Sequence, residues 1–253
     1  MTSALLNPPS SKSRPLIEAD VSGVPVYRLS VEKYHRMIEH AILDENDPVE
    51  LLEGLLIEKE SPSYSPLPIF KLSVERYHRM IEFGILGEDD PVELIQGILV
   101  TKMSKNTPHS VCTRKIRYRI EPLLPKGWFL DTQEPVTTSD GEPEPDHAAV
   151  RGQPDDYLPK HPTAVDVGLL IEVADSSLLI DRTEKKQTYA RANFPIYWIA
   201  NLVDRQIEVY TQPSGPAENS DYAQQQIYRV GDAVPLVIDG TQLGTIPVGD
   251  LLP

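Results

Sequence analysis

The chain has 253 residues, with 24 Lys and Arg against 38 Asp and Glu, and its formal net charge is therefore −14. This charge disfavours generic nucleic-acid binding, which depends on neutralising phosphates, although it is compatible with a local basic face or an acidic metal site. A hydrophobic content of 40% is sufficient for a core, and the single cysteine, Cys112, excludes a disulfide framework and a cysteine-based zinc site.

The N-terminal residues carry no targeting or membrane signal. The first twenty residues lack the apolar core of a signal peptide. No apolar run approaches the roughly 20 residues that a membrane span needs. We therefore expect a soluble cytoplasmic protein with no membrane partner. Residues 1–25 are polar and rich in Pro and Ser, and they predict a disordered tail.

An internal repeat follows the tail. The segment LSVEKYHRMIEHAIL, which begins at Leu29, returns as LSVERYHRMIEFGIL at Leu72, an offset of 43 residues (72 minus 29). Each copy predicts a helix capped by Ser30 or Ser73, followed by a strand or hairpin. We expect Val31, Tyr34, Ile38 and Ile42 to form the apolar face of the first helix.

The repeat sets the expected domain organisation. Residues 26–66 predict an accessory unit formed by the first copy, and residues 61–68 (SPSYSPLP) predict its linker. The second copy continues directly into the rest of the chain, so that residues 67–253 are expected to form the main domain. Glycines at 54 and 97 are expected to turn the chain within a short β ribbon in each copy.

A basic helix is predicted next, over residues 109–124. Its residues Arg114, Lys115, Arg117 and Arg119 form the densest basic cluster in the chain. A solvated helix face and a face that contacts DNA phosphates both fit this pattern.

Strands dominate the remainder. Residues 128–136 predict a strand, an acidic loop over 139–146 ends at Asp146, and residues 147–151 predict another strand. Residues 206–211 and 222–230 predict a hairpin, and a last short strand follows residue 234. Strands mixed with a few helices predict an α/β domain with a mixed central sheet.

The chain is organised around residues 167–198. Residues 167–174 predict a buried strand, Asp181 with Glu184 has the spacing of a helix capping box, and residues 194–200 predict a second buried strand. We expect the two strands to be parallel neighbours joined by a right-handed crossover.

Glu172 is anomalous in the first of these strands because a buried carboxylate needs a cation, a metal or a hydrogen-bond donor. Lys185 in the following helix is a candidate cation, and Tyr189 follows it at i+4. A purely structural ion pair is one interpretation. The other is a functional site, because Asp146 precedes the neighbouring strand and two carboxylates are what Mg²⁺ takes from a protein.

The motif series of residues 71–253 resembles a large bacterial family described as putative restriction endonucleases, within the PD-(D/E)XK nuclease superfamily. The matching pieces are residues 92–100 (VELIQGILV), His109, 144–146 (EPD), 169–177 (LLIEVADSS), 181–185 (DRTEK), 189–191 (YAR), 195–199 (PIYWI) and 206–210 (QIEVY). The resemblance implies a restriction-endonuclease-like fold, in which helices flank a mixed central β-sheet.

The resemblance also implies the site residues. Asp146 matches the Pro-Asp aspartate, and Glu172 matches the second metal carboxylate. The superfamily usually places its lysine two residues after that glutamate, where this chain has Ala174, but Lys185 matches the lysine of the resembling family. Glu93 and His109 match a further glutamate and histidine that assist the site.

Three functions follow as hypotheses. The first is a Mg²⁺-dependent endonuclease, with Mn²⁺ as a substitute, that cleaves double-stranded DNA. In it Asp146 and Glu172 bind the metal and Lys185 orients water or stabilises charge. The superfamily commonly pairs subunits, which implies a homodimer. The second is a catalytically weak or inactive nuclease-fold module that binds or regulates by acting through protein partners. The third is a hydrolase of a small phosphorylated substrate.

Overall fold

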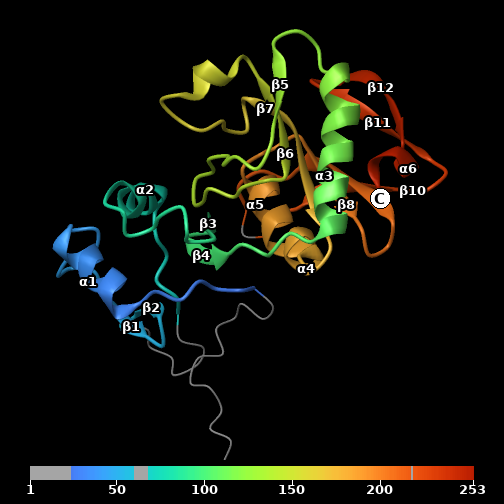
Figure 1. The fold of residues 1–253 in the computed structure, drawn as a ribbon. Coiled ribbons are helices and arrows are strands. Elements are labelled where there is room, and N and C mark those ends of the chain that lie inside the picture. The colour runs from blue at the N-terminus through green and yellow to red at the C-terminus, as the bar shows by residue number, and fades with distance from the viewer. Residues whose placement is uncertain (1–23, 60–67, 218) are drawn as a thin grey trace, which may run out of the picture.

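A computed structural model shows the fold of the protein (Figure 1) and describes residues 24–59, 68–217 and 219–253. The expected tail lies outside the described residues except for residues 24 and 25, and the expected linker lies outside them except for Pro68. None of the helices in these three ranges is long and apolar enough to cross a membrane.

A six-stranded mixed sheet forms the centre of the α/β fold, in the order β10-β9-β8-β7-β6-β5. Its strands are β5 (Trp128–Asp131), β6 (His147–Arg151), β7 (Val167–Ala174), β8 (Ile196–Asn201), β9 (Gln206–Pro213) and β10 (Tyr222–Arg229). β7 and β8 are parallel and the other neighbours are antiparallel. The mixed sheet, the parallel pair and the 206–230 hairpin were predicted, and all three are confirmed.

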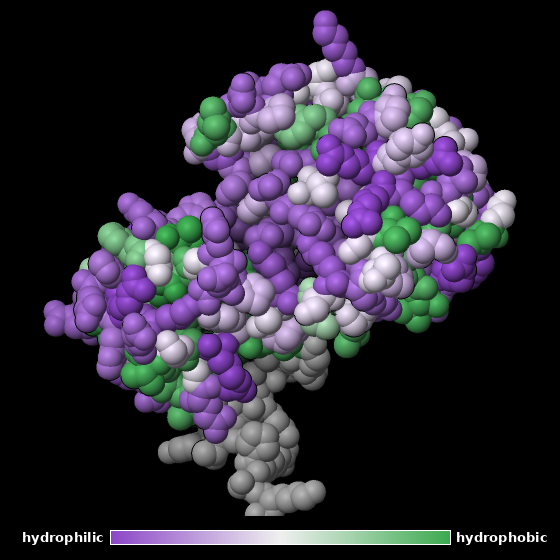
Figure 2. Space-filling model, in the orientation of Figure 1, coloured by the Kyte–Doolittle hydropathy of each residue, from purple (hydrophilic) through white to green (hydrophobic). Residues whose placement is uncertain are grey.

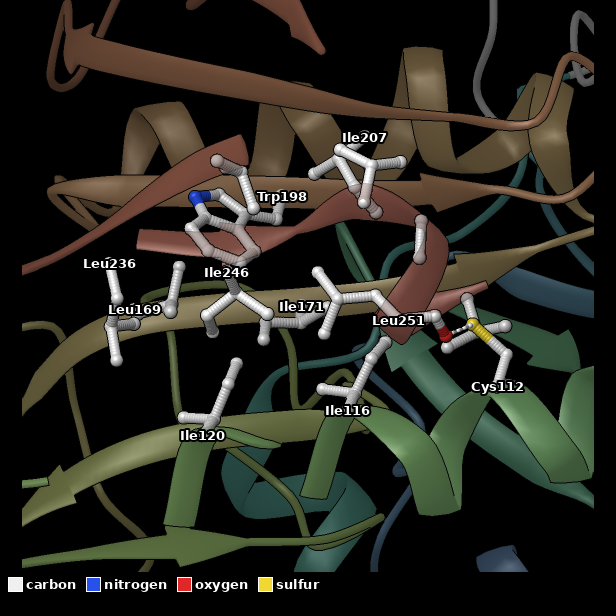
Figure 3. Close-up of a cluster of buried hydrophobic side chains, with 14 of the residues drawn as sticks. Cys112, Ile116, Ile120, Leu169, Ile171, Trp198, Ile207, Leu236, Ile246 and Leu251 are labelled. Carbon is white, nitrogen blue, oxygen red and sulfur yellow. Dashed lines mark hydrogen bonds between the residues drawn. The ribbon is translucent and has the colours of Figure 1, made fainter. Parts of the chain in front are cut away.

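Both faces of the sheet are covered, which explains why all eight residues of β7 are buried. One face packs against α3 (Thr107–Ile120), α6 (Val248–Leu251) and the hairpin of β11 (Ala233–Ile238) and β12 (Thr241–Pro247). Figure 3 shows this core, in which Trp198 and Ile171 of the sheet belong to the same apolar cluster as Ile116 and Ile120 of α3.

The other face packs against α5 (Lys186–Arg191). Tyr189 of α5 lies edge-on to Tyr197 of β8, with ring centroids 5.0 Å apart, and it lies edge-on to Phe194 as well. All three side chains are fully buried. Since neighbouring residues of a strand point to opposite faces, Ile171 and Val173 join the α3 core, while Glu172 points toward α5.

Three predictions of secondary structure are wrong. The strand predicted over 128–136 ends at Asp131, and the single strand expected near the C-terminus is the β11–β12 hairpin. The predicted helix start at Asp181 is also wrong, because α4 (Leu178–Ile180) already precedes it and the Asp181 amide donates to the Ser177 carbonyl. Asp181–Lys185 is instead a π-helical turn between α4 and α5.

The two copies of the repeat have the same structure. The first contains α1 (Val31–Glu39), β1 (Val49–Leu52) and β2 (Leu55–Glu58), and the second contains α2 (Val74–Glu82), β3 (Val92–Ile95) and β4 (Ile98–Thr101). The predicted caps are confirmed, since Ser30 and Ser73 each accept a hydrogen bond from the third residue of the helix. Each hairpin turns at a residue pair with positive φ, Glu53-Gly54 or Gln96-Gly97.

The predicted apolar face of the first helix is partly wrong. Ile42 is buried and Tyr34 is half-buried, but Val31 is 61% exposed and Ile38 is 48% exposed. Met37, which was not predicted, is fully buried instead. The helix therefore turns a different stripe inward, and this stripe packs into one apolar cluster shared by both copies.

Candidate active site

The sheet brings Asp146 and Glu172 together. Asp146 immediately precedes β6, and the pairing of β6 with β7 places His147 opposite Ile171. The backbone amide of Val173 consequently donates to Asp146 Oδ2 at 2.9 Å. Both carboxylates are almost completely buried. The expectation that they converge at one region of the sheet is confirmed, while their roles remain predictions.

The π-helical turn and α5 place two donors on Glu172. Lys185 Nζ lies 3.0 Å from Glu172 Oε1, and the Tyr189 hydroxyl donates to the same oxygen at 2.8 Å. Lys185 is only 8% exposed, so this ion pair lies within the protein and is weakly screened by solvent. The cation that the sequence predicted for Glu172 is thus the one found.

A third carboxylate comes from the second repeat. Glu93 of β3 lies with its Oε1 atom 3.3 Å from Lys185 Nζ, and its Oε2 atom accepts the amide of Glu144 at 2.9 Å. The turn of the same hairpin contacts the π-helical turn and α5, since the Gln96 amide lies within hydrogen-bonding distance of Glu184, Gln187 and Thr188. The second repeat therefore supports the lysine-bearing segment as well as supplying a charged group.

His109, in the first turn of α3, completes the contacts of Asp146. Its Nε2 atom lies 3.0 Å from Asp146 Oδ2, and the Gln133 amide donates to Asp146 Oδ1 at 3.2 Å. Asn106 caps α3 through the His109 amide, which fixes the position of the histidine. Gln133 was not predicted as a site residue, because it lies in a loop with no motif around it.

These side chains line one cleft. Its walls include the five predicted residues Glu93, His109, Asp146, Glu172 and Lys185, together with Gln133, Asp175 and Asp181. Figure 2 shows a hollow with hydrophilic walls near the centre of the drawn face, over the region where β3 and β4 meet α4 and α5 in Figure 1. Asp181 had been predicted only as a helix cap, and the sequence held no signal that it would line the cleft.

Burial and neighbouring charges set the protonation of the site. Burial raises the pKa of Glu172 and outweighs the lowering effect of Lys185. Burial likewise raises the pKa of Asp181 to about 6. Burial opposes the charge of Lys185, but Glu172 and Glu93 raise the pKa of its ammonium well above the ordinary value. Lys185 is accordingly a cation at neutral pH, which suits a hydrogen-bond donor and excludes a general base.

Asp146 behaves in the opposite way. Burial would raise its pKa, but the hydrogen bond and charge of His109, with the Val173 amide, hold the pKa of Asp146 below its usual value. The site therefore combines one carboxylate that stays ionised with two acids whose charge is costly. A bound cation would lower the cost of these two buried charges.

The donor chemistry fits a hard divalent ion. Carboxylate oxygens are the ligands that Mg²⁺ takes from proteins, and one or two of them suffice because waters and phosphate oxygens complete the octahedron. Within the described residues, no three His, Cys, Asp or Glu side chains converge on a common point as a ready-made metal site. Asp146 and Glu172 are the residues that would hold the ion.

The predicted DNA-contacting residues do not line this cleft. Lys115 donates to the carbonyls of Gly249 and Leu252, Arg119 pairs with Asp250, and Arg117 pairs with Glu121. Arg114 lies with Lys115 and Arg119 beside a shallow surface pocket. Two of these four residues, Lys115 and Arg119, hold α3 against the C-terminal segment, and the role of the cluster in contacting DNA stays a prediction.

Comparison with known proteins places the chain in a family. The model of the family Uma2, described as "Putative restriction endonuclease", matches residues 74–245. The chain belongs to the Uma2 family. The match begins at the first residue of α2, so it includes the second repeat and the whole cleft but not α1. No curated protein matches the chain.

The Uma2 assignment agrees with the fold. A solved structure described as a putative nuclease belonging to DUF820, from Anabaena variabilis, is similar to the chain with a TM-score of 0.52 and 15% sequence identity. The similarity covers 71% of this chain and 97% of that one. At this identity the likeness shows the fold alone, which is the nuclease fold predicted from the sequence.

Proposed function

We propose that the protein is a Mg²⁺-dependent endonuclease that hydrolyses phosphodiester bonds of double-stranded DNA, with Mn²⁺ as a substitute for Mg²⁺. The observation that carries the proposal is the convergence of Asp146, Glu172 and Lys185 in one hydrophilic cleft of a chain from this family. A bound divalent ion acts as a Lewis acid and lowers the pKa of a water molecule that it holds.

The protein residues then have separate roles. Asp146 and Glu172 hold the ion through their carboxylates. The Lys185 ammonium, kept protonated by its two carboxylate neighbours, donates to the attacking water or to a phosphate oxygen on which charge grows. His109 and the Val173 amide keep Asp146 ionised, and Tyr189 fixes the orientation of Glu172.

Supercoiled-plasmid cleavage tests this proposal. The wild-type protein is expected to cut plasmid with Mg²⁺ or Mn²⁺ and to be inactive in a chelator, and Glu172→Gln is expected to lower the rate by about 100-fold or more. Glu144→Gln is the matched control, since Glu144 lines the same cleft but pairs with Lys102. Equal activity of the wild type and Glu172→Gln would rule out Glu172 as a ligand of the catalytic metal ion.

A second candidate is a nuclease-fold module that acts through protein partners without cleaving DNA. The internal pairing of Lys115, Arg117 and Arg119 favours it, because those side chains are then less available for phosphates, and so does the net charge of −14. It predicts no cleavage with any divalent ion. The homodimer and the division into residues 26–66 and 67–253 stay predictions, and a single chain does not test them.

A further inference from the structure

The two repeats contact each other reciprocally. Arg36 of the first copy donates to the carbonyls of Phe83 and Gly84, and Arg79 of the second donates to those of His40 and Ala41. With the 43-residue offset of the repeat, these are the same contact made twice, in opposite directions. Such reciprocity is the property of an isologous two-fold interface.

Among the described residues, the other polar contacts between the copies also come in equivalent pairs, except that the Tyr27 hydroxyl donates to Asp90 and its equivalent, Phe70, has no hydroxyl. Lys33 pairs with Asp90, and the equivalent Arg76 pairs with the equivalent Asp47. The backbone amide of Tyr27 donates to the carbonyl of Leu99, and the backbone amide of Phe70 donates to the carbonyl of Leu56. In the same way, the backbone amide of Thr101 donates to the carbonyl of Pro25, and that of Glu58 donates to the carbonyl of Pro68. A pseudo-two-fold axis therefore runs between the copies.

One contact marks the position of the axis. The rings of His40 and Phe83, which occupy equivalent places in the two copies, stack on each other with centroids 4.3 Å apart. Both copies contribute to one apolar cluster, whose members include the equivalent residues Met37 and Met80, both fully buried. An apolar face of this kind is not stable in water and requires a partner.

The second copy alone carries both halves of the interface. Arg76 is the counterpart of Lys33 and Asp90 is present, so two second copies related by a two-fold axis would form the Arg76–Asp90 pair twice. Arg79 would likewise meet the carbonyls of Phe83 and Gly84, with Phe83 stacked on its own equivalent at the axis. This face is thus self-complementary.

We propose that the second repeat is a homotypic dimerisation surface, and that the first repeat occupies this surface within the same chain as a built-in replacement for a second subunit. The chain therefore does not dimerise through this face. A second copy of the chain binds there only when the first repeat is displaced. The proposal is independent of nuclease activity.

Light scattering and cross-linking of the full chain test the proposal. In the absence of a dimer through another face, the wild-type protein is expected to have the mass of one chain, 28.3 kDa, at micromolar concentrations. In the double variant His40→Cys with Phe83→Cys, a short bismaleimide is expected to join the two cysteines within one chain. Phe83→Cys alone is the matched control and should form no cross-link between chains. Cys112 is fully buried and does not compete.

A second variant displaces the first repeat without altering the second. Lys33→Asp with Arg36→Ala places a like charge against Asp90 and removes two backbone contacts. We expect its mass to double with rising concentration, and Phe83→Cys in this background to cross-link between chains. Two results would overturn the proposal. One is a wild-type protein of twice the chain mass that cross-links between chains, and the other is a displaced variant that stays monomeric.

Discussion

Replacement of Lys185 by methionine tests how the cleft is held together. The ammonium lies 3.0 Å from Glu172 and 3.3 Å from Glu93, and a methionine of similar length would leave two buried carboxylates facing each other without a cation. Removing one member of a buried pair costs about 3 to 5 kcal/mol, because the remaining charge is desolvated and uncompensated. We expect Lys185→Met to lower the free energy of unfolding by that amount at neutral pH.

The pH dependence distinguishes this cause from lost packing. Without Lys185, the folded-state pKa of Glu172 rises further above its unfolded value, so the folded state binds a proton that the unfolded state releases. Stability then falls as pH rises between those two values, by about 1.4 kcal/mol per pH unit for each such proton. The deficit of Lys185→Met should be smallest near pH 5 and should grow toward neutral pH.

Urea denaturation followed by tryptophan fluorescence measures both effects. Lys186→Met is the matched control, since Lys186 pairs with Asp221, whose side chain is 58% exposed, and such a pair contributes about 1 kcal/mol or less. A deficit for Lys185→Met that equals the control, or one that does not change between pH 5 and 8, would refute the reasoning.

Three further predictions follow from the same geometry. Asp181→Asn should raise the free energy of unfolding at neutral pH by about 2 kcal/mol relative to its effect at pH 4, because the stability of a carboxyl with a raised pKa is lost as pH rises toward about 6. Denaturation at the two pH values checks it, and an equal effect of the substitution at both would contradict it. Glu93→Gln should slow plasmid cleavage at least tenfold, while Glu50→Gln, the exposed equivalent in the first repeat, should leave the rate unchanged. Gly97→Ala should lower stability more than Gly127→Ala in thermal denaturation. Both positions have positive φ, but only an added Cβ at 97 would meet a neighbouring atom, the Cβ of Lys71, at 2.8 Å. Equal losses of stability would contradict this prediction.

The sequence was sufficient to predict the central sheet and the position of the cleft. The buried runs of β7 and β8 and the crossover between them follow from local pattern, and Glu172 stood out because a carboxylate in such a strand requires a partner. Lys185 was the candidate cation in the helix predicted after that strand, and it is the partner found.

Residues whose contacts depend on distant segments could not be predicted. Asp181 had the spacing of a helix cap, but α4 forms before it, and the π-helical turn directs its side chain into the cleft. Lys115 and Arg119 of α3 contact the last residues of the chain, and no local pattern encodes these contacts. The buried stripe of α1 likewise depends on the second repeat, which lies 43 residues further along the chain.

A crystal structure of the protein soaked with Mn²⁺ tests the central claim most directly, because anomalous scattering identifies the ion. We predict one Mn²⁺ bound by oxygens of both Asp146 and Glu172, and its loss in Glu172→Gln. An ion bound elsewhere with none between these two carboxylates, or the same ion retained in Glu172→Gln, would contradict the account.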